Sequence, residues 1–257
     1  MEKKYFFFDI DGTLTDRSTG KIVPSAREAL DRLEANGHFV AIATGRAHYK
    51  ARKFTGANGF KNMVCCGGNG CVINNELVEN IPLDKEGCLQ IIHQSEELGY
   101  GWCVALDDTK DVYMTDDKFL RQVGKRKEPT RYIIDDMLDI DSVDAIYKIY
   151  VAIPKEEEEK LTKKELIGHL RFEPEYLMFQ PDNKRGGIIK MMEHLNADIK
   201  DVVVFGDDYN DMDMFCPEWF SIAMGNACQD LKDMASYVTD TNVNDGIKKA
   251  CEYFEWI

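Results

Sequence analysis

Short, mostly apolar runs alternate with helical segments at both ends of this chain. The runs lie at residues 5–8, 39–43, 63–66, 201–205, 220–223 and 237–239. Runs of this length and composition are typical of strands that are covered on both faces. Strands that alternate with helices favour parallel pairing, with helices on both faces of the sheet. The sequence therefore predicts an α/β fold in which both ends of the chain build one parallel sheet.

Apolar residues at helical spacing fill the gaps between these runs. Ser25 and Glu28 form a capping-box signature, and the helical pattern that follows reaches Gly37, where we expect the helix to stop. Further helices are expected from about residue 47 and over residues 186–195, 228–235 and 243–254.

The middle of the chain has a different pattern. Residues 102–106, 112–114 and 146–153 alternate between apolar and polar, which indicates half-buried strands, and helices are expected around residues 85–98 and 155–169. The charge run at residues 155–160 is interpreted as the solvated face of one of these helices. We therefore expect a core domain formed by residues 1–81 and 182–257, with an α+β domain, residues 82–181, inserted into it.

Charge and composition exclude several classes of partner. The 257 residues include 46 acidic and 32 basic side chains, and the net charge of −14 repels nucleic acid and anionic membrane surfaces. No apolar run approaches the roughly 20 residues of a membrane span, and Asp9 interrupts the apolar N-terminal stretch before a signal-peptide pattern develops. The eight cysteines and five histidines lack the spacing of a metal site. We expect a cytoplasmic protein.

Two aspartates directly follow the first predicted strand. Residues two apart in extended chain point to the same side, so Asp9 and Asp11 face the same space while Ile10 faces away. Gly12 permits a sharp turn after them. Both aspartates lie at the carboxyl end of the predicted strand, and ligands of open α/β sheets bind at that edge of the sheet. Asp-Gly is also a common turn dipeptide, so the pair alone is equally consistent with a turn.

A second acidic group follows the predicted strand 201–205. Asp207 and Asp211 would share the sheet edge with Asp9 and Asp11, where so many carboxylates repel one another. A hard divalent cation removes that repulsion, and ligands that are all oxygen favour Mg²⁺ over zinc. An acidic helix N-terminus would explain one or two of the aspartates, but not their match with the first pair.

Groups suited to phosphate binding occur at two further places. Thr44, Gly45 and Arg46 end the second predicted strand and offer a hydroxyl, backbone N–H groups and a guanidinium. Lys184 precedes a predicted helix, from which its ammonium could reach the same sheet edge. Each alone has a commoner explanation, an N-cap threonine and a solvent-exposed lysine.

The motifs occur in a specific order along the chain, namely Asp9-x-Asp11-Gly-Thr, Thr44-Gly-Arg, Lys184 and Gly206-Asp-x-x-Asn-Asp211. In this order they resemble the haloacid dehalogenase (HAD) superfamily, and more narrowly its Cof-type phosphatases, which carry a C2B-type cap. Segments 68–70, 223–227 and 244–246 also match. The resemblance implies a Rossmann-like core, an inserted α+β cap and phosphatase activity on a small phosphorylated metabolite.

The resemblance also implies a role for each matched residue. Asp9 would attack phosphorus and form an aspartyl-phosphate, and Asp11 would act first as general acid and then as base. Thr44 and Lys184 would hold the transferring phosphoryl oxygens. The resemblance further implies that Mg²⁺ is bound by Asp9, Asp11, Asp207 and Asp211. It also implies that the substrate phosphate is contacted by Gly45, Arg46 and Asn210.

The sequence departs from the family pattern at two positions, and three alternative functions remain open. Arg185 and Cys71 stand where the family usually has glycine and alanine. A phosphomutase of the same superfamily would return the phosphoryl group to its substrate. A receiver domain of about half this length, or a catalytically silent binding protein, would use similar groups without turnover. The sequence specifies neither the substrate, which could be a sugar phosphate, a nucleotide or a phosphorylated cofactor, nor whether the chain is a monomer or a weak homo-oligomer.

Overall fold

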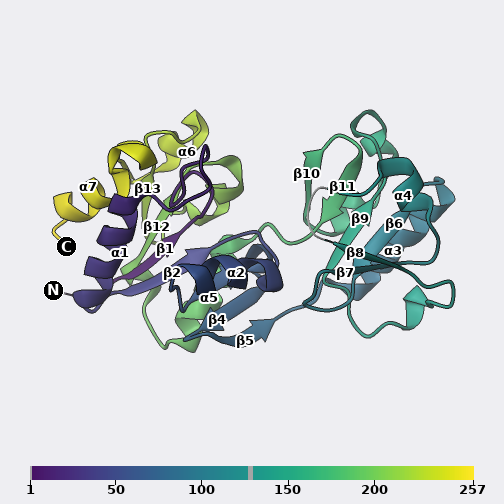
Figure 1. Ribbon diagram of the computed structural model, residues 1–257, viewed down its shortest axis with the longest axis horizontal. Coiled ribbons are helices and arrows are strands. Elements are labelled where there is room, and N and C mark those ends of the chain that lie inside the picture. The colour runs from purple at the N-terminus through teal and green to yellow at the C-terminus, as the bar shows by residue number, and fades with distance from the viewer. Residues whose placement is uncertain (1, 127–129) are drawn as a thin grey trace. The chain divides into compact units, whose positions relative to one another are not determined.

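The computed structural model describes residues 2–126 and 130–257, which form two compact units (Figure 1). The first unit consists of the chain up to Arg46 together with Lys53–Glu79 and Asn183–Ile257. The second consists of Ala47–Arg52 and Asn80–Asp182.

The first unit is built on an eight-stranded sheet with the order β14-β13-β12-β1-β2-β3-β4-β5. Neighbouring strands from β14 to β3 pair in parallel, and β4 runs antiparallel to β3. The strands are β1 (Tyr5–Phe8), β2 (Phe39–Ala43), β3 (Met63–Cys65), β4 (Gly70–Ile73), β5 (Glu76–Asn80), β12 (Val202–Gly206), β13 (Phe220–Ala223) and β14 (Tyr237–Val238). Segments from both ends of the chain thus lie side by side, and the prediction of an α/β fold with a parallel sheet is confirmed.

Helices cover both faces of this sheet. They are α1 (Pro24–Ala35), α5 (Lys184–His194), α6 (Gln229–Met234) and α7 (Gly246–Tyr253), while α2 (His48–Ala57) begins in the second unit and ends in the first. Because side chains alternate across a strand, Phe7 packs with Ile188 and Met191 of α5 on one face. Phe6 points to the other face and contacts the ring of Trp256, which follows α7. The helices α1 and α7 lie against each other (Figure 1).

Several helix starts differ from the sequence expectation. The helix expected from residue 186 begins at Lys184, so this lysine lies within the helix and not before it. The first helix begins at Pro24, with Val23 at its N-cap and no side-chain cap, so the predicted capping box at Ser25 is wrong. The reason is that proline, with its fixed φ and no N–H group, suits the first helical position and moves the N-cap two residues earlier. The last helix begins at Gly246 rather than at Val243, after a short 3-10 turn that ends in left-handed backbone at Asp245.

The second unit contains a six-stranded sheet with the order β10-β11-β9-β6-β7-β8. Its strands are antiparallel except for the parallel pair β7 and β8. The elements are β6 (Trp102–Ala105), β7 (Asp111–Met114), β8 (Arg131–Ile134), β9 (Lys148–Val151), β10 (His169–Glu173), β11 (Tyr176–Phe179), α3 (Lys85–Glu97) and α4 (Lys118–Val123). Ile149 and Leu177 pack with Ile91 of α3, whereas Tyr150 and Phe119 belong to the cluster on the opposite face.

The helix predicted over residues 155–169 is absent. Two 3-10 segments, η3 (Lys155–Lys160) and η4 (Lys164–Leu166), replace it. Four consecutive glutamates repel one another on a helix, and tertiary ion pairs hold them in another arrangement. Glu158, for example, accepts a 2.7 Å hydrogen bond from Arg171. No residue of η3 is buried, so the run is solvated as expected, but it is not the face of an α-helix.

The remaining short segments are also 3-10 turns, at η1 (Cys66–Gly68), η2 (Ile140–Ser142), η5 (Ile199–Asp201), η6 (Tyr209–Met214) and η7 (Asn242–Asn244).

Among the helices of residues 2–126 and 130–257, none has both the length and the apolar character needed to cross a bilayer.

Candidate active site

The carboxyl ends of the central strands bring the two predicted acidic groups together. β1 and β12 are parallel neighbours in which Phe8 pairs with Phe205. Asp9 follows one strand directly and Asp207 follows the other after Gly206, so both emerge at the same sheet edge although nearly 200 residues separate them. This outcome follows from parallel pairing, because it aligns the ends of strands that are distant in sequence.

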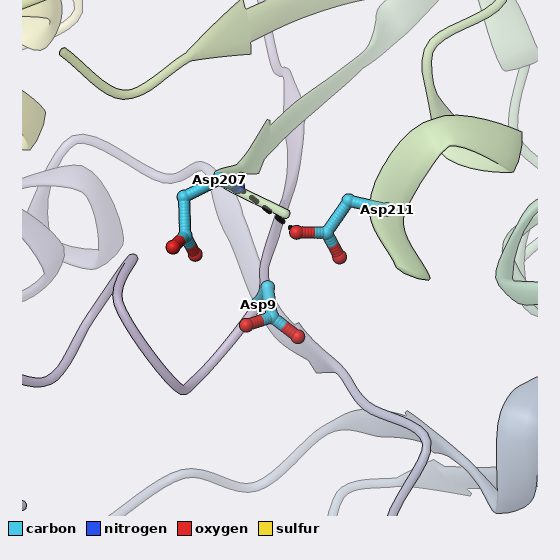
Figure 2. Close-up of side chains that lie close together, drawn as sticks. All are labelled: Asp9, Asp207 and Asp211. Atoms are coloured by element: carbon cyan, nitrogen blue, oxygen red, sulfur yellow. Dashed lines mark hydrogen bonds between the residues drawn. The ribbon is translucent and has the colours of Figure 1, made fainter. Parts of the chain in front are cut away.

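Asp9, Asp207 and Asp211 form a compact acidic triad (Figure 2). One carboxylate oxygen from each residue lies within 4.8 Å of those from the other two. All three side chains are buried. A cluster of buried carboxylates is electrostatically costly unless cations lie beside it.

The Asp211 carboxylate is held by three donors. Its Oδ2 accepts hydrogen bonds from the backbone N–H groups of Asp207, at 2.9 Å, and Asp208, at 3.2 Å, and the first of these is drawn in Figure 2. Its Oδ1 accepts a 2.6 Å bond from Lys184 Nζ. A Cβ on Gly206 would lie 2.8 Å from the Asp211 carboxylate, which explains why this strand ends in glycine. Asp211 therefore fixes the turn that carries Asp207.

Lys184 is the buried cation of the site. It is the first residue of α5, and its Nζ lies 2.8 Å from Asp9 Oδ1 and 2.6 Å from Asp211 Oδ1. Burial alone would lower the pKa of Lys184, but the two carboxylates outweigh it and the pKa is raised. Arg185, the departure from the family pattern, contacts Glu218 with its guanidinium and Asp213 with its backbone N–H.

One buried ammonium does not neutralise three buried carboxylates. Burial, followed by repulsion from Asp211, raises the pKa of Asp9 to about 7, although Lys184 opposes the shift. Burial also raises the pKa of Asp207 to about 6, against the hydrogen bond from Thr13. The site thus holds more negative charge than its own cations balance at neutral pH.

Asp11 has a different environment from Asp9. Its backbone N–H donates to Asp9 Oδ2 at 2.9 Å. Its carboxylate is 63% exposed and accepts two bonds of 2.7 and 2.8 Å from Arg46 Nη2. The pair at positions 9 and 11 therefore divides into one buried carboxylate and one exposed carboxylate that is held by an arginine.

The other predicted residues lie at the ends of β2 and β12. Thr44 is buried, and its Oγ1 accepts a 3.2 Å bond from the backbone N–H of Arg46, which tightens the turn after β2. Gly45 is half-buried in this turn, and Asn210 is half-buried in η6 next to Asp211. Arg46 contacts Asp11, as described above, and so joins this turn to the one that follows β1.

Three residues that contact Asp207 were not assigned roles from the sequence. Thr13 Oγ1 donates to Asp207 Oδ1 at 2.8 Å, and Arg17 Nη2 and Asn226 Nδ2 donate to Oδ2 at 2.8 and 3.4 Å. Thr13 and Asn226 lie inside motifs that matched the family, so a signal for them was present. Arg17 lies in a polar turn with no motif, and only the folded chain brings it to Asp207.

The residues present fit a hard divalent cation. The triad supplies only carboxylate oxygens, and each Asp9 oxygen accepts a single bond, from Lys184 or from the Asp11 N–H, which leaves lone pairs available. Burial, with repulsion from Asp211 in addition, raises the pKa values of Asp9 and Asp207, and a bound cation would favour their charged forms against both effects. Cys71, by contrast, is buried in β4 and burial raises its pKa to about 12, so it is no soft ligand.

Comparison with known proteins agrees with this geometry. The Bacillus subtilis (strain 168) protein named "Putative phosphatase YkrA" is 29% identical over 253 residues, which are 97% of each chain. Pyridoxal phosphate phosphatase YbhA of Escherichia coli (strain K12) is 27% identical over 96% of this chain and 97% of its own. The crystal structure of a hypothetical protein from Geobacillus kaustophilus HTA426 has a TM-score of 0.82 at 26% identity, over the whole of both chains.

The family model described as haloacid dehalogenase-like hydrolase matches residues 6–251. The match begins within β1 and ends within α7, so it includes the triad, Lys184 and the inserted second unit. The resemblance to HAD phosphatases of the Cof type is thereby confirmed. The chain belongs to the haloacid dehalogenase-like hydrolase family.

Proposed function

We propose that this protein is a Mg²⁺-dependent phosphatase that hydrolyses a small phosphorylated metabolite through an aspartyl-phosphate on Asp9. Its family and its full-length phosphatase relatives identify it as a phosphoric monoester hydrolase. The observation that carries the rest is the setting of Asp9. Lys184 Nζ and the Asp11 N–H orient its two oxygens, and the triad places it beside Asp207.

In the first half-reaction, a carboxylate oxygen of Asp9 attacks phosphorus, the new O–P bond forms and the ester P–O bond breaks. The leaving alkoxide needs a proton, and Asp11 in its protonated form is the donor we propose. The exposure of Asp11 supports this role, because a leaving group on the solvent side can reach it. Thr44 and Lys184 would bind the phosphoryl oxygens and stabilise the charge in the transition state.

In the second half-reaction, the Asp11 carboxylate takes a proton from water while the water oxygen attacks phosphorus. The bond between phosphorus and Asp9 breaks, inorganic phosphate leaves and Asp9 is regenerated as a carboxylate. Asp11 thus ends the cycle protonated and ready to donate again. Arg46, which holds the Asp11 carboxylate, would keep it in place through both steps.

The Asp9 and Asp207 carboxylates and the Asp11 carbonyl would hold Mg²⁺, with Asp211 supporting them. When bound, the cation shields the anionic nucleophile from the anionic phosphate and orients that phosphate. Mg²⁺ is preferred over zinc because the donor set is all oxygen, with no thiol or imidazole in the triad.

We propose that the second unit, predicted as residues 82–181, is a cap that contacts the leaving group. Relatives named as phosphatases of pyridoxal phosphate, phosphoglycolate and a ribitylaminouracil phosphate support a small phosphorylated metabolite as substrate. None of the eight cysteines, which all lie among the described residues, forms a disulfide, and this supports a location in the reducing cytoplasm.

A screen of phosphorylated metabolites for phosphate release tests the proposal. Wild type should release phosphate with Mg²⁺ and stop in EDTA. Asp9→Asn should lose at least about 10⁴-fold in kcat because it lacks the nucleophile, while Asp31→Asn on the surface of α1 should retain wild-type turnover. Full activity of Asp9→Asn, or of wild type in EDTA, would refute the mechanism. Dependence on a bisphosphate, with the phosphoryl group kept on the substrate, would instead identify a phosphomutase.

A further inference from the structure

Arg17 extends from a turn whose backbone is fixed. The Asp16 carboxylate accepts bonds of 2.8 Å from Ser18 N and Ser18 Oγ, and the Asp16 carbonyl accepts a 2.8 Å bond from Gly20 N. The side chain of Arg17 is 57% exposed. Its Cα is therefore held in place, while the guanidinium can move between positions on the solvent side.

The guanidinium bridges two neighbouring aspartates. Arg17 Nη2 lies 2.8 Å from Asp207 Oδ2 and 2.8 Å from Asp208 Oδ2. The Asp207 side chain is 1% exposed, whereas that of Asp208 is 42% exposed. One partner is thus the buried member of the proposed cation site, and the other is a solvent-side carboxylate outside the triad.

Gly12 provides the space for this contact. A Cβ at Gly12 would lie 2.2 Å from Asp207 Oδ2 and 2.5 Å from Arg17 Nε, and the φ of +98° is one that side chains disfavour. A larger residue would therefore separate the guanidinium from Asp207. The close approach depends on the glycine at this position.

We infer that Arg17 competes with the divalent cation for Asp207 and thereby sets the affinity of the site for that cation. This inference rests on the proposed function, because it requires Asp207 to be a ligand. In the cation-free protein the guanidinium partly balances the buried carboxylate, and cation binding releases Arg17 from Asp207.

The charges and partners explain why release is feasible. Guanidinium keeps its charge at any physiological pH, so it repels a cation that shares the same carboxylate. Asp208 remains as a partner after Arg17 leaves Asp207, so the arginine is not stranded. Lys184 has no such alternative, because it is fully buried between Asp9 and Asp211. Arg17 is thus the cation beside Asp207 that can move away when a divalent cation binds.

Calorimetric titration of metal-stripped, full-length protein with Mg²⁺ tests this inference without measuring turnover. Arg17→Gln should bind Mg²⁺ about threefold to tenfold more tightly than wild type, since it removes a competing charge of modest strength. The matched control is Arg32→Gln on α1, another half-exposed arginine in ion pairs, which should leave the Mg²⁺ Kd unchanged. Arg17→Lys keeps the positive charge and should therefore bind Mg²⁺ more weakly than Arg17→Gln does.

Thermal unfolding gives a second readout. In EDTA, Arg17→Gln should lower Tm more than Arg32→Gln does, because Asp207 loses its partner. In saturating Mg²⁺ that difference should disappear. Equal or weaker Mg²⁺ binding by Arg17→Gln would overturn the inference and make Arg17 a support for Asp207.

The same titration separates this inference from the proposed function. If wild type binds Mg²⁺ and Asp207→Asn does not, the cation site stands whatever the result for Arg17→Gln. If wild type and Asp207→Asn are alike in binding no Mg²⁺, both the cation site and the competition fail, and phosphate release by the screen decides whether any phosphatase activity remains.

Discussion

The Nζ of Lys184 lies 2.8 Å from Oδ1 of Asp9, although 175 residues separate the two in sequence. Both side chains are buried, so neither charge is stabilised by water. An ion pair of this kind contributes less through its own attraction than through the penalty of leaving one charge behind when its partner is removed. Lys184 is therefore required for the stability of the cation-free site as well as for the chemistry proposed above.

Lys184→Met should destabilise the cation-free protein by about 3–5 kcal/mol, because two carboxylates lose the buried counter-charge that they share. Urea unfolding in EDTA measures this loss. Lys190→Met, on the same helix but in no ion pair with the triad, should cost under about 1 kcal/mol. The double variant Lys184→Met/Asp211→Asn should recover part of the stability, and strictly additive losses would contradict the coupling.

The raised pKa of Asp9 predicts how the free energy of unfolding depends on pH. Its pKa rises from an ordinary 3.8 to about 7 on folding, so between roughly pH 4 and pH 7 the folded protein holds a proton that the unfolded chain has lost. Its contribution is greatest at low pH and is lost as the pH rises toward 7. In EDTA, the stability of Asp9→Asn relative to wild type should therefore increase between pH 5 and pH 8.

Thermal unfolding of both proteins across this range is the measurement. Comparison with Asp9→Asn is essential because the net charge of −14 makes the whole protein self-repelling as pH rises. A constant difference between the two proteins from pH 5 to pH 8 would show that Asp9 titrates at its ordinary value.

Strand ends were the most predictable part of the molecule. Apolar runs with no alternation identified buried parallel strands, and parallel pairing then required Asp9 and Asp207 to meet at one edge. The segment at residues 155–169 was not predictable in the same way. The conformation of this segment depends on an ion pair with Arg171, which lies outside the segment. The local pattern of apolar and polar residues gives no information about that contact.

Contacts made by long side chains could not be predicted from the sequence either. Lys184 was expected near phosphate, yet which atoms its ammonium would reach depends on the packing of α5 against the sheet. Arg17 lies in a turn that composition would assign to the surface, and its exposure agrees with that. Its contact with Asp207 arises only because Gly12 leaves room.

Asp11→Asn should distinguish the two half-reactions. An ester of an aliphatic alcohol needs the acid to protonate its leaving group, so kcat should fall by about 10²–10⁴-fold. With p-nitrophenyl phosphate the leaving group departs without help, but hydrolysis of the aspartyl-phosphate still lacks its base. Stopped-flow measurement should then show a burst of about one equivalent of p-nitrophenolate per site before slow turnover.

The control for this experiment is Asp31→Asn, an exposed aspartate that is also paired with an arginine. It should show neither the burst nor the fall in kcat. If Asp11→Asn lost the same factor on both esters and gave no burst, the Asp11 carboxylate would act through the turn that its contact with Arg46 holds, and not as an acid and base.

The contact between α5 and the sheet predicts opposite effects for two helical glycines. A Cβ on Gly187 of α5 would lie 2.4 Å from Val64 Cγ1 and 2.7 Å from Gly68 Cα, and a backbone atom cannot move aside as a side-chain tip can. Gly187→Ala should therefore destabilise by about 1–3 kcal/mol through overpacking. Gly56 in α2 has no heavy atom within 4 Å of the same position.

Gly56→Ala should stabilise the protein by about 0.5–1 kcal/mol, since alanine lowers the entropy of the unfolded chain and the helix has space for its methyl group. Urea unfolding of both variants gives the sign. Because Gly187 follows Lys184 within the first turn of α5, its displacement would also move the ammonium away from Asp9. Gly187→Ala should thus reduce kcat, whereas Gly56→Ala should leave it unchanged, and a Gly187→Ala protein of full stability and activity would mean that α5 packs less closely on the sheet than these distances require.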